Sequence, residues 1–265
     1  MAPTRVSSRQ HPIVQACRRV AAGRGEPGVV LLDGEHLVDE AIGARVVVRA
    51  LLTRATDSPV VVRAALAGAK VYVGTAAALE AASPVRSAGE MVALADWTPA
   101  PLTSALIAAD RVTLALVDVQ DPGNVGSAIR SADALGAAAV VAAGATADPA
   151  GWKALRGAMG STFHLPVART DVDTLVAAAR TARARIAATT LGDGEPLATS
   201  RLTAPLVILL GNEGAGLPPS LVRQADARIR VPMRPGANSL NVAVTAALIL
   251  YEVGRQRSSQ PARHP

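Results

Sequence analysis

Short apolar runs alternate along the chain with longer stretches in which apolar residues recur every three or four positions. The short runs predict β-strands, and the longer stretches predict helices. The predicted strands cover residues 29–32, 46–53, 71–73, 91–95, 112–117, 138–142, 186–189, 206–210 and 228–231. The predicted helices cover residues 8–22, 34–42, 58–67, 153–159, 171–183 and 240–257, with another ending at Leu135 and a short one starting near Pro218. This alternation is typical of an α/β fold.

A turn-rich stretch divides the pattern into two parts. Residues 96–101 contain Pro99 and Pro101, and such a stretch is typical of a linker. We therefore expect a small α/β domain over residues 1–97, a linker and domain start over 98–109, a second domain over 110–257 and a disordered tail over 258–265. The runs 112–117 and 206–210 are apolar throughout, which predicts strands of a parallel sheet buried on both faces. The apolar helix 240–257 is expected in the core or against a second subunit.

Composition narrows the class of partner. Of the 265 residues 50% are hydrophobic, which excludes wholesale disorder, and only 2% are aromatic. So few aromatic residues argue against RNA binding by base-stacking modules such as RRM or OB domains. The net charge is +6, and all the basic residues except Lys70 and Lys153 are arginines, whose planar fork suits phosphate. A polyanionic partner would explain this balance, and so would a GC-rich genome.

Cysteine and histidine exclude other classes. The single cysteine, Cys17, allows no intrachain disulfide, and the four histidines lack metal-ligand spacing, so no metal is expected. The first twelve residues are polar and basic without an apolar signal region, and no run approaches the ~18 apolar residues of a membrane span. We expect a cytoplasmic protein that is not bound to a membrane.

The first loop with candidate chemistry is D-P-G-N-V-G-S-A-I-R, residues 121–130, which follows a predicted strand and opens a helix. A helix N-terminus offers free N–H groups to an anion, and the glycines let backbone approach a ligand. Helical spacing places residues 123, 126, 127 and 130 on one face. The alternative interpretation is an ordinary strand–turn–helix connection with Arg130 on the surface.

The second loop is G-N-E-G-A-G-L-P, residues 211–218, directly after the strand 206–210. Glycine-rich loops at strand carboxyl ends hold ligands in open α/β sheets. The spacing matches neither G-x-G-x-x-G nor a P-loop, which argues against a dinucleotide or nucleoside-triphosphate site. Glu213 is a candidate polar anchor, and a plain β–turn–α connection is the alternative.

The third loop is V-P-M-R-P-G-A-N-S-L-N, residues 231–241, which leads into the last helix. We expect Ser239 to be the N-cap of that helix and Asn241 to lie in its first turn. Capping rather than catalysis is the alternative role for both residues.

The order and separation of the three loops resemble the signature motifs of the SpoU/TrmH family of RNA ribose 2′-O-methyltransferases, in the SPOUT superfamily. The resemblance covers residues 110–257 and includes L-R-G-A-M-G-S-T-F-H-L-P-V at 155–167. Residues 32–41 of the first half resemble, more weakly, the small RNA substrate-binding domain that precedes many such catalytic domains.

The resemblance implies a trefoil knot in the second domain, formed by the second and third loops, that holds S-adenosylmethionine (AdoMet) in a bent form. It also implies a homodimer whose active site is shared across the interface. The cofactor contacts implied in this way are Leu209, Gly211, Asn212, Val231, Met233, Ser239, Leu240 and Asn241.

In such a family the ribose 2′-hydroxyl attacks the cofactor's methyl group in line, without a metal. Arg130 matches the family's catalytic arginine, and the other matching active-site positions are Asn124, Glu213, Ser239 and Asn241. A guanidinium group stays protonated in nearly any protein setting, so we expect Arg130 to clamp a phosphate rather than act as a base. Glu213 is either a base or a structural hydrogen-bond partner.

The RNA contacts expected besides Arg130 are Lys153, Arg156, Arg18 and Arg19, to which Arg24 could add. Trp97 and Trp152 have no predicted function. The extra first domain favours 23S rRNA as substrate, by analogy only. Two alternatives stay open: a tRNA 2′-O-methyltransferase, and a catalytically inactive RNA-binding or ribosome-assembly protein of the same fold.

Overall fold

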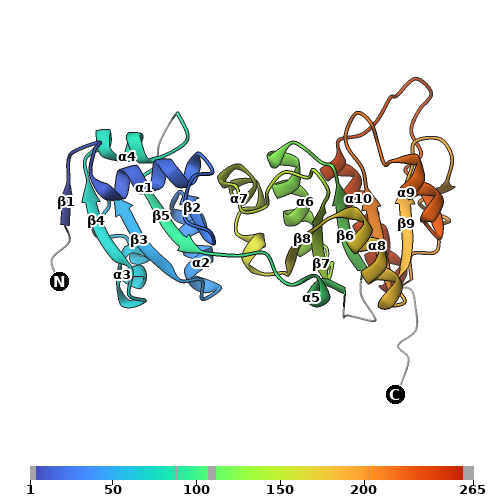
Figure 1. Ribbon diagram of the computed structural model, residues 1–265, viewed down its shortest axis with the longest axis horizontal. Helices are drawn as coiled ribbons and strands as arrows, with labels where there is room; N and C mark the ends of the chain where they lie inside the picture. The colour runs from blue at the N-terminus through green and yellow to red at the C-terminus, as the bar shows by residue number, and fades with distance from the viewer. Residues whose placement is uncertain (1–3, 87–88, 107–111, 204, 259–265) are drawn as a thin grey trace, which may run out of the picture. The chain divides into compact units, whose positions relative to one another are not determined.

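The computed structural model describes residues 4–86, 89–106, 112–203 and 205–258. The chain forms two compact units, shown in Figure 1. The first contains Met1–Thr98 and Ala150–His164, and the second contains Pro99–Pro149 and Leu165–Pro265. The division after Thr98 lies inside the predicted linker 96–101. Residues 107–109 of the expected domain start and residues 259–265 of the expected tail lie outside the described residues.

The first unit is built on a mixed five-stranded sheet in the order β1-β4-β3-β5-β2. Neighbours β1, β4 and β3 are parallel, whereas β5 runs antiparallel to both β3 and β2. The strands are β1 (Thr4–Val6), β2 (Val29–Asp33), β3 (Val48–Thr53), β4 (Lys70–Gly74) and β5 (Met91–Asp96).

Helices cover both faces of this sheet because successive residues of its strands point to opposite sides. Leu31 belongs to the apolar cluster under α1 (Pro12–Ala21) and α4 (Ala76–Ala82). Its neighbour Leu32 belongs to the cluster under α2 (Glu35–Gly43) and α3 (Pro59–Leu66). Ser58 caps α3 by accepting a hydrogen bond from the backbone N–H of Val60.

A segment from the second half of the sequence completes the first unit. Helix α7 (Trp152–Ala158) packs beside β2, the edge strand, and is followed by the 3₁₀ turn η1 (Ser161–Phe163). Leu155 is fully buried in the cluster under α2 and α3, and Trp152 is half-buried against the cluster on the other face. The helix predicted at 153–159 is therefore present, but its apolar face is buried in the first unit, whereas the sequence-based division assigned residues 150–164 to the second domain.

The second unit contains a seven-stranded sheet in the order β10-β12-β9-β11-β6-β7-β8. All its paired strands are parallel, and β6, β7 and β11 are buried along their whole length. The strands are β6 (Val112–Val117), β7 (Ala139–Ala143), β8 (Val167–Thr170), β9 (Arg185–Thr189), β10 (Glu195–Pro196), β11 (Leu206–Leu210) and β12 (Ala227–Arg230).

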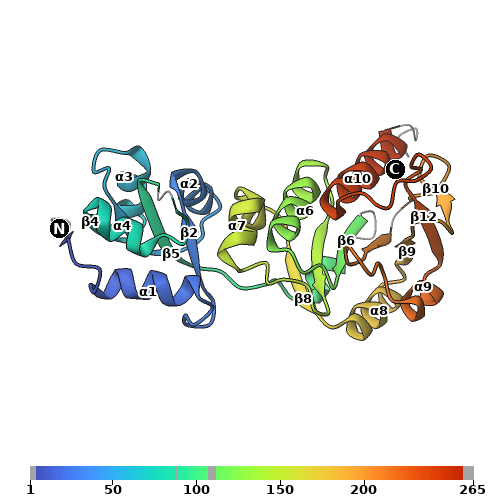
Figure 2. The same ribbon diagram turned by 90° about the horizontal axis from the view of Figure 1, so that it is seen from above.

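Two helical layers enclose this sheet (Figure 2). One layer, packed on the cluster that contains Ala115 and Val117, consists of α5 (Leu102–Leu106), α8 (Val172–Thr181) and α9 (Pro219–Gln224). The other contains α6 (Pro122–Ala134) and α10 (Val242–Ser258), which pack against each other. No helix among the described residues is long and apolar enough to cross a membrane.

Strand order predicts where this sheet binds a ligand. The chain adds β7 and β8 on one side of β6, then crosses to build β9 on the other side, with β11 between β6 and β9. In open parallel sheets, ligands bind beyond the carboxyl ends of the strands at such a reversal of strand order. The carboxyl ends of β6, β11, β9 and β12 are therefore the place to look for a site.

Candidate active site

A cavity of about 290 Å³ lies in the second unit at the carboxyl ends of β9, β11 and β12. Thr189 and Leu210 reach it from the last positions of β9 and β11, and Ile249 reaches it from α10. The second and third sequence loops supply most of the remaining wall. The strand order and the loop motifs thus identify the same place.

The loop after β11 is shaped by its own asparagine. The side-chain Oδ1 of Asn212 accepts hydrogen bonds from the backbone N–H groups of Gly214 and Ala215, at 2.9 and 3.0 Å. Its Nδ2 donates to the carbonyl oxygen of Asp118, 2.9 Å away, at the end of β6. A Cβ atom on Gly211 would collide with the backbone of Gly216, so only glycine allows this loop to close on itself.

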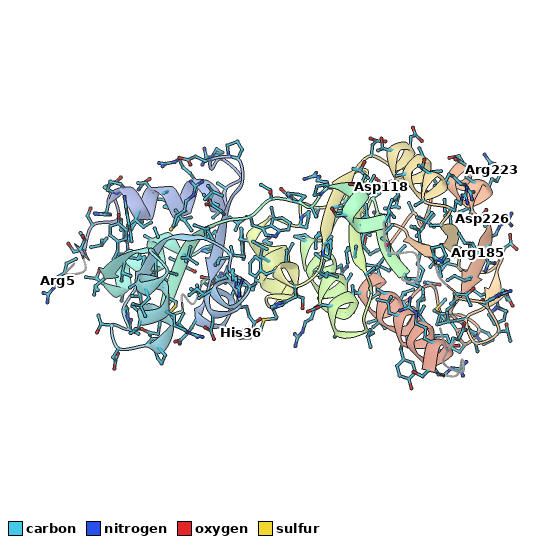
Figure 3. The ribbon with its side chains drawn as sticks, turned by 90° about the horizontal axis from the view of Figure 1, so that it is seen from below. Arg5, His36, Asp118, Arg185, Arg223 and Asp226 are labelled. Atoms are coloured by element: carbon cyan, nitrogen blue, oxygen red, sulfur yellow. The ribbon has the colours of Figure 1, made fainter. Side chains whose placement is uncertain are left out.

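Asp118 supports the loop after β11 through its carbonyl oxygen, and the sequence did not single it out. It follows β6 with a φ of 56°, in the left-handed region where a non-glycine residue costs about 1–2 kcal/mol. Its Oδ1 accepts a hydrogen bond of 2.7 Å from the backbone N–H of Ala145, beyond β7. Figure 3 shows Asp118 in the second unit. A polar residue directly after a buried strand was the signal available in the sequence.

A chain of side-chain hydrogen bonds joins the three loops. Asn241 Nδ2 donates to Asn124 Oδ1 at 2.8 Å, and Asn124 Nδ2 donates to Glu213 Oε1 at 2.8 Å. The direction of this chain is fixed at both ends. The Oδ1 of Asn241 already accepts from backbone N–H groups, and an ionised carboxylate can only accept. Asn124 is therefore the donor to Glu213.

The cap of the last helix differs from the sequence-based expectation. Helix α10 begins at Val242, and Asn241 caps it by accepting hydrogen bonds from the backbone N–H groups of Ala243 and Val244 at 2.9 and 3.2 Å. The prediction that Ser239 is the cap, with Asn241 inside the first turn, was wrong. Asn241 is the residue directly before the helix, so its short side chain reaches the free N–H groups. Ser239 instead lines the cavity.

Most of the expected cofactor contacts lie at this cavity. Those that line it are Gly211, Asn212, Val231, Met233, Ser239 and Leu240. Leu209 does not line it, because its side chain is fully buried in the apolar cluster that contains Ala115 and Val117. Asn241 does not line it either, since its side chain is held by Asn124 at the neighbouring edge. The lining residues that sequence reasoning missed are at strand ends and include Thr189, Thr190, Leu191, Ile229 and Arg230.

Four of the expected catalytic residues lie at or beside the cavity, and the fifth, Arg130, does not. Asn124, Glu213 and Asn241 are hydrogen-bonded, and Glu213 and Ser239 line the cavity. Arg130 is exposed on α6, does not line the cavity, and makes no side-chain hydrogen bond or ion pair with the residues that the structure describes. Its guanidinium group is therefore open to an external anion.

The other expected RNA contacts all lie in the first unit. Arg18 and Arg19 are exposed in the last turn of α1. Lys153 Nζ lies 5.5 Å from the ring centroid of Trp152. Arg156 Nη1 lies 3.7 Å from Asp33 Oδ2.

The cavity fits a small organic cofactor with both apolar and polar parts. Leu217, Val231 and Leu240 offer apolar contacts, and the glycine-rich loop offers close approach to backbone groups. Its volume lies at the lower end of the range of about 300–1,000 Å³ that is usual for small-molecule sites. Among the described residues no group of three or more metal-ligating side chains exists.

Comparison with known proteins agrees with this geometry. The SpoU rRNA Methylase family matches residues 111–251. The 23S rRNA (guanosine(2553)-2′-O)-methyltransferase RlmP of Bacillus subtilis is 33% identical over 230 residues, which are 87% of this chain and 90% of that protein. The AdoMet-bound rRNA methyltransferase from Sinorhizobium meliloti has a TM-score of 0.87 at 30% identity, over 96% of this chain and 98% of that one.

A second cofactor-bound structure is also similar. The SpoU methyltransferase AviRb from Streptomyces viridochromogenes, in complex with AdoMet, has a TM-score of 0.81 at 30% identity and covers 95% of this chain and 100% of its own. The fold, the cavity and these likenesses define an RNA methyltransferase that uses AdoMet. The chain belongs to the SpoU rRNA methylase family.

Proposed function

We propose that this protein methylates a ribose 2′-hydroxyl of 23S rRNA in the cytoplasm, with AdoMet as the methyl donor. The observation that carries the proposal is the hydrogen-bonded chain Asn241–Asn124–Glu213 beside the cavity, since it brings together one residue from each of the three family motifs. The likeness to RlmP extends over 87% of the chain, including the first unit, which supports 23S rRNA over tRNA.

The residues act by alignment and by proton removal. AdoMet, when bound, supplies an electrophilic methyl group. In-line attack requires the ribose hydroxyl to be held at the right angle, and such positioning contributes much of the rate in two-substrate reactions. Arg130 has no partner among the described residues, so it is free to clamp the phosphate next to the target ribose.

Glu213 is our candidate for the acceptor of the hydroxyl proton. It is the only carboxylate among the described residues that line the cavity. Asn124 donates to its Oε1, which orients the carboxylate. A guanidinium group has donors only and no acceptor, so Arg130 does not take this role.

The test incubates the protein with labelled AdoMet and unmodified total bacterial RNA, which is then separated by size. We expect label in the 23S band. Arg130→Ala should lose methyl transfer and keep its affinity for AdoMet, because Arg130 does not line the cavity. Equal loss of AdoMet affinity would contradict the clamp role. Label in the tRNA band would correct the substrate, and RNA binding without label in any band would favour an inactive RNA-binding protein.

We also propose that the protein is a homodimer through the exposed face of α10. Val244, Leu248 and Tyr251 are 49%, 40% and 64% exposed and recur at helical spacing. They line a groove with residues of α6, and Asn124 and Asn241 lie in the same groove. A second copy on this face would cover the apolar side chains and border the active-site chain, which supports a shared site.

A further inference from the structure

A basic groove of about 490 Å³ lies on the first unit, between the end of α1 and the end of α4. Arg18, Arg19 and Arg24 line one side, and Ser83 and Trp152 line the other parts of the wall. No acidic residue is among those that line it in the described chain. We call this feature the arginine groove.

The three arginines differ from several other arginines of the first unit. Arg49 and Arg63 each form an ion pair with a carboxylate. Among the described residues no carboxylate or carbonyl group bonds the side chains of Arg18, Arg19 or Arg24. The C-terminus of a helix favours cations, which explains positive charge at this end of α1. The helix C-terminus alone does not explain why three guanidinium groups without carboxylate partners surround one groove. An external anion would supply the missing hydrogen-bond acceptors.

The end of α1 fixes the third arginine next to the other two. The backbone N–H of Arg24 donates to the carbonyl oxygen of Arg19 at 2.8 Å, which folds the chain back onto the helix. Gly23 makes this turn possible because its φ is 68°, in the left-handed region. Arg24 therefore belongs to the ordered end of the helix.

Trp152 supplies an aromatic wall. The ammonium of Lys153 lies over this ring, 5.5 Å from its centroid, so a base that stacks on the same face would replace it. Helix α7 is anchored by the buried Leu155 and by the ion pair between Arg156 and Asp33. Ser83, which also lines the groove, donates a hydrogen bond of 2.8 Å to Asp33. At this junction the side chain of Asp33 is only 6% exposed, whereas that of Arg156 is 52% exposed.

We propose that the arginine groove binds an unpaired nucleotide of the substrate RNA, with the base stacked on Trp152 and the adjacent phosphates on Arg18, Arg19 and Arg24. This inference rests on the proposed function, since it takes RNA to be the substrate. An aromatic ring binds a base of any sequence through its π-face, and arginine binds phosphate through its fork. Bases inside a duplex are stacked on both faces, so the groove selects a loop, bulge or single strand. The low aromatic content does not oppose this, because one tryptophan suffices for one base.

Fluorescence tests the stacking directly. The chain contains two tryptophans, so Trp97→Phe leaves Trp152 as the sole reporter. A short RNA hairpin with an unpaired loop should quench this fluorescence in a saturable way, whereas a blunt duplex of the same stem should not. Equal quenching by hairpin and duplex, or hairpin binding without quenching, would overturn the proposal. Quenching by polyglutamate but not by the hairpin would assign the groove to an acidic peptide instead.

Variants separate stacking from packing. Trp152→Leu keeps apolar volume without an aromatic face and should raise KM for RNA about tenfold, with kcat and AdoMet affinity unchanged. Trp152→Tyr should restore most of the wild-type KM. A merely structural tryptophan would instead show loss of thermal stability in both variants and no difference between them in KM.

The arginines are tested with a control of equal charge. Arg18→Ala/Arg19→Ala/Arg24→Ala should weaken hairpin binding and reduce the slope of log K against log salt by about 2, at roughly 0.7 per phosphate contact of a single strand. The control changes Arg5, Arg9 and Arg45, which are exposed and without ion pairs among the described residues, and should alter the slope far less. Arg5 is labelled in Figure 3. If the wild type methylates RNA and both triple variants bind alike, this inference alone fails; if the wild type methylates no RNA, the proposed function fails.

Discussion

Asn124 is the residue at which the three loops meet. It donates to Glu213 and accepts from Asn241, so its amide uses both of its polar atoms to hold the site together. The backbone N–H of Asn124 also donates a hydrogen bond of 2.9 Å to Oδ1 of Asp121, which is the N-cap of α6. The position thus requires one donor and one acceptor on the same short side chain, which an amide provides and a carboxylate does not.

Exchanging the amide and the carboxylate tests this arrangement. Asn124→Asp places two carboxylates at hydrogen-bond distance, and we expect about 1–3 kcal/mol lower stability at pH 8 from urea unfolding. The loss should shrink towards pH 5, because one of two interacting carboxyl groups then keeps a proton. Asn124→Asp/Glu213→Gln should recover stability, since the new glutamine donates to the new aspartate, which can also accept from Asn241.

Activity of the exchanged variant then tests the role of Glu213. We expect kcat to stay at least about a hundredfold below wild type, because the hydrogen bonds are restored while the carboxylate at position 213 is absent. Recovery of full activity would mean that Glu213 only holds Asn124 in place.

At the scale of residues, the sequence indicated which side chains matter but not all of their bonds. Asn124, Glu213 and Asn241 were identified from three motifs, and the structure joins them. Asp118 and Thr189 were missed, since their roles depend on strands β6 and β9 ending at the same edge of the sheet. Pairings of this kind depend on strand order, which is not readable from local pattern.

At the scale of elements, the carboxyl ends and the amino ends of the strands in the second sheet have different roles. The carboxyl edge holds the cavity, whereas the amino edge holds a charged anchor around Asp226, labelled with Arg185 and Arg223 in Figure 3. Asp226 accepts hydrogen bonds of 2.7 Å from Arg180 on α8 and 2.8 Å from the backbone N–H of Ile186 on β9. Asp226 therefore joins helix α8 to the start of strand β9.

This anchor should be sensitive to acid. Partial burial raises the pKa of Asp226. The hydrogen bonds from Arg180 and Ile186, together with the charges of Arg180 and Arg185, lower it by a larger amount, so the net shift is downward. A carboxyl whose pKa is lowered on folding stabilises the protein above its unfolded pKa of about 3.9, and this contribution is lost as pH falls through the folded pKa.

Asp226→Asn should therefore lower the free energy of unfolding by about 1 kcal/mol at pH 7, a figure discounted for the partial exposure of the pair. The difference from wild type should shrink as the pH falls below the unfolded pKa of about 3.9 and vanish once the pH has passed through the lowered pKa of folded Asp226. Urea unfolding at several pH values measures it. Asp57→Asn is the control, because Asp57 is exposed and has no side-chain bond among the described residues. A difference that stays constant as the pH is lowered from 7 until the protein unfolds would contradict the anchor.

Element prediction succeeded where apolar runs were long and failed where they were short or uniform. β6 and β11 have the predicted bounds, because both are continuous apolar runs. β1 was missed, as it is three residues long at a sheet edge, and β8 was missed because it contains Arg169 and Thr170. Helix α4 is mostly alanine, so its sequence shows no apolar periodicity even though Leu79 is buried.

At the scale of the whole molecule, the exposed face of α10 should control oligomeric state. Leu248→Glu/Tyr251→Glu places charge on this face, and we expect a monomer in analytical ultracentrifugation where the wild type is a dimer. Methyl transfer should fall with it, since the active-site chain borders the same groove. Leu66→Glu is the control: Leu66 is 83% exposed on α3, and the variant should remain dimeric. A monomeric wild type would contradict the proposed dimer.

The sequence predicted the α/β class and the linker, since both follow from local pattern. It placed residues 150–164 in the second domain because they are contiguous with it in sequence, whereas the burial of Leu155 places them in the first unit. The trefoil knot implied by the family resemblance stays a prediction, as do the roles of the two units.

The return of the chain to the first unit has a consequence for modularity. The backbone passes between the units three times, after Thr98, after Pro149 and after His164. A gene fragment that stops at Thr98 would lack Leu155 from its interior and the helix beside β2. The first unit is therefore not a cassette that one recombination event can exchange, because part of its interior is encoded in the second half of the sequence.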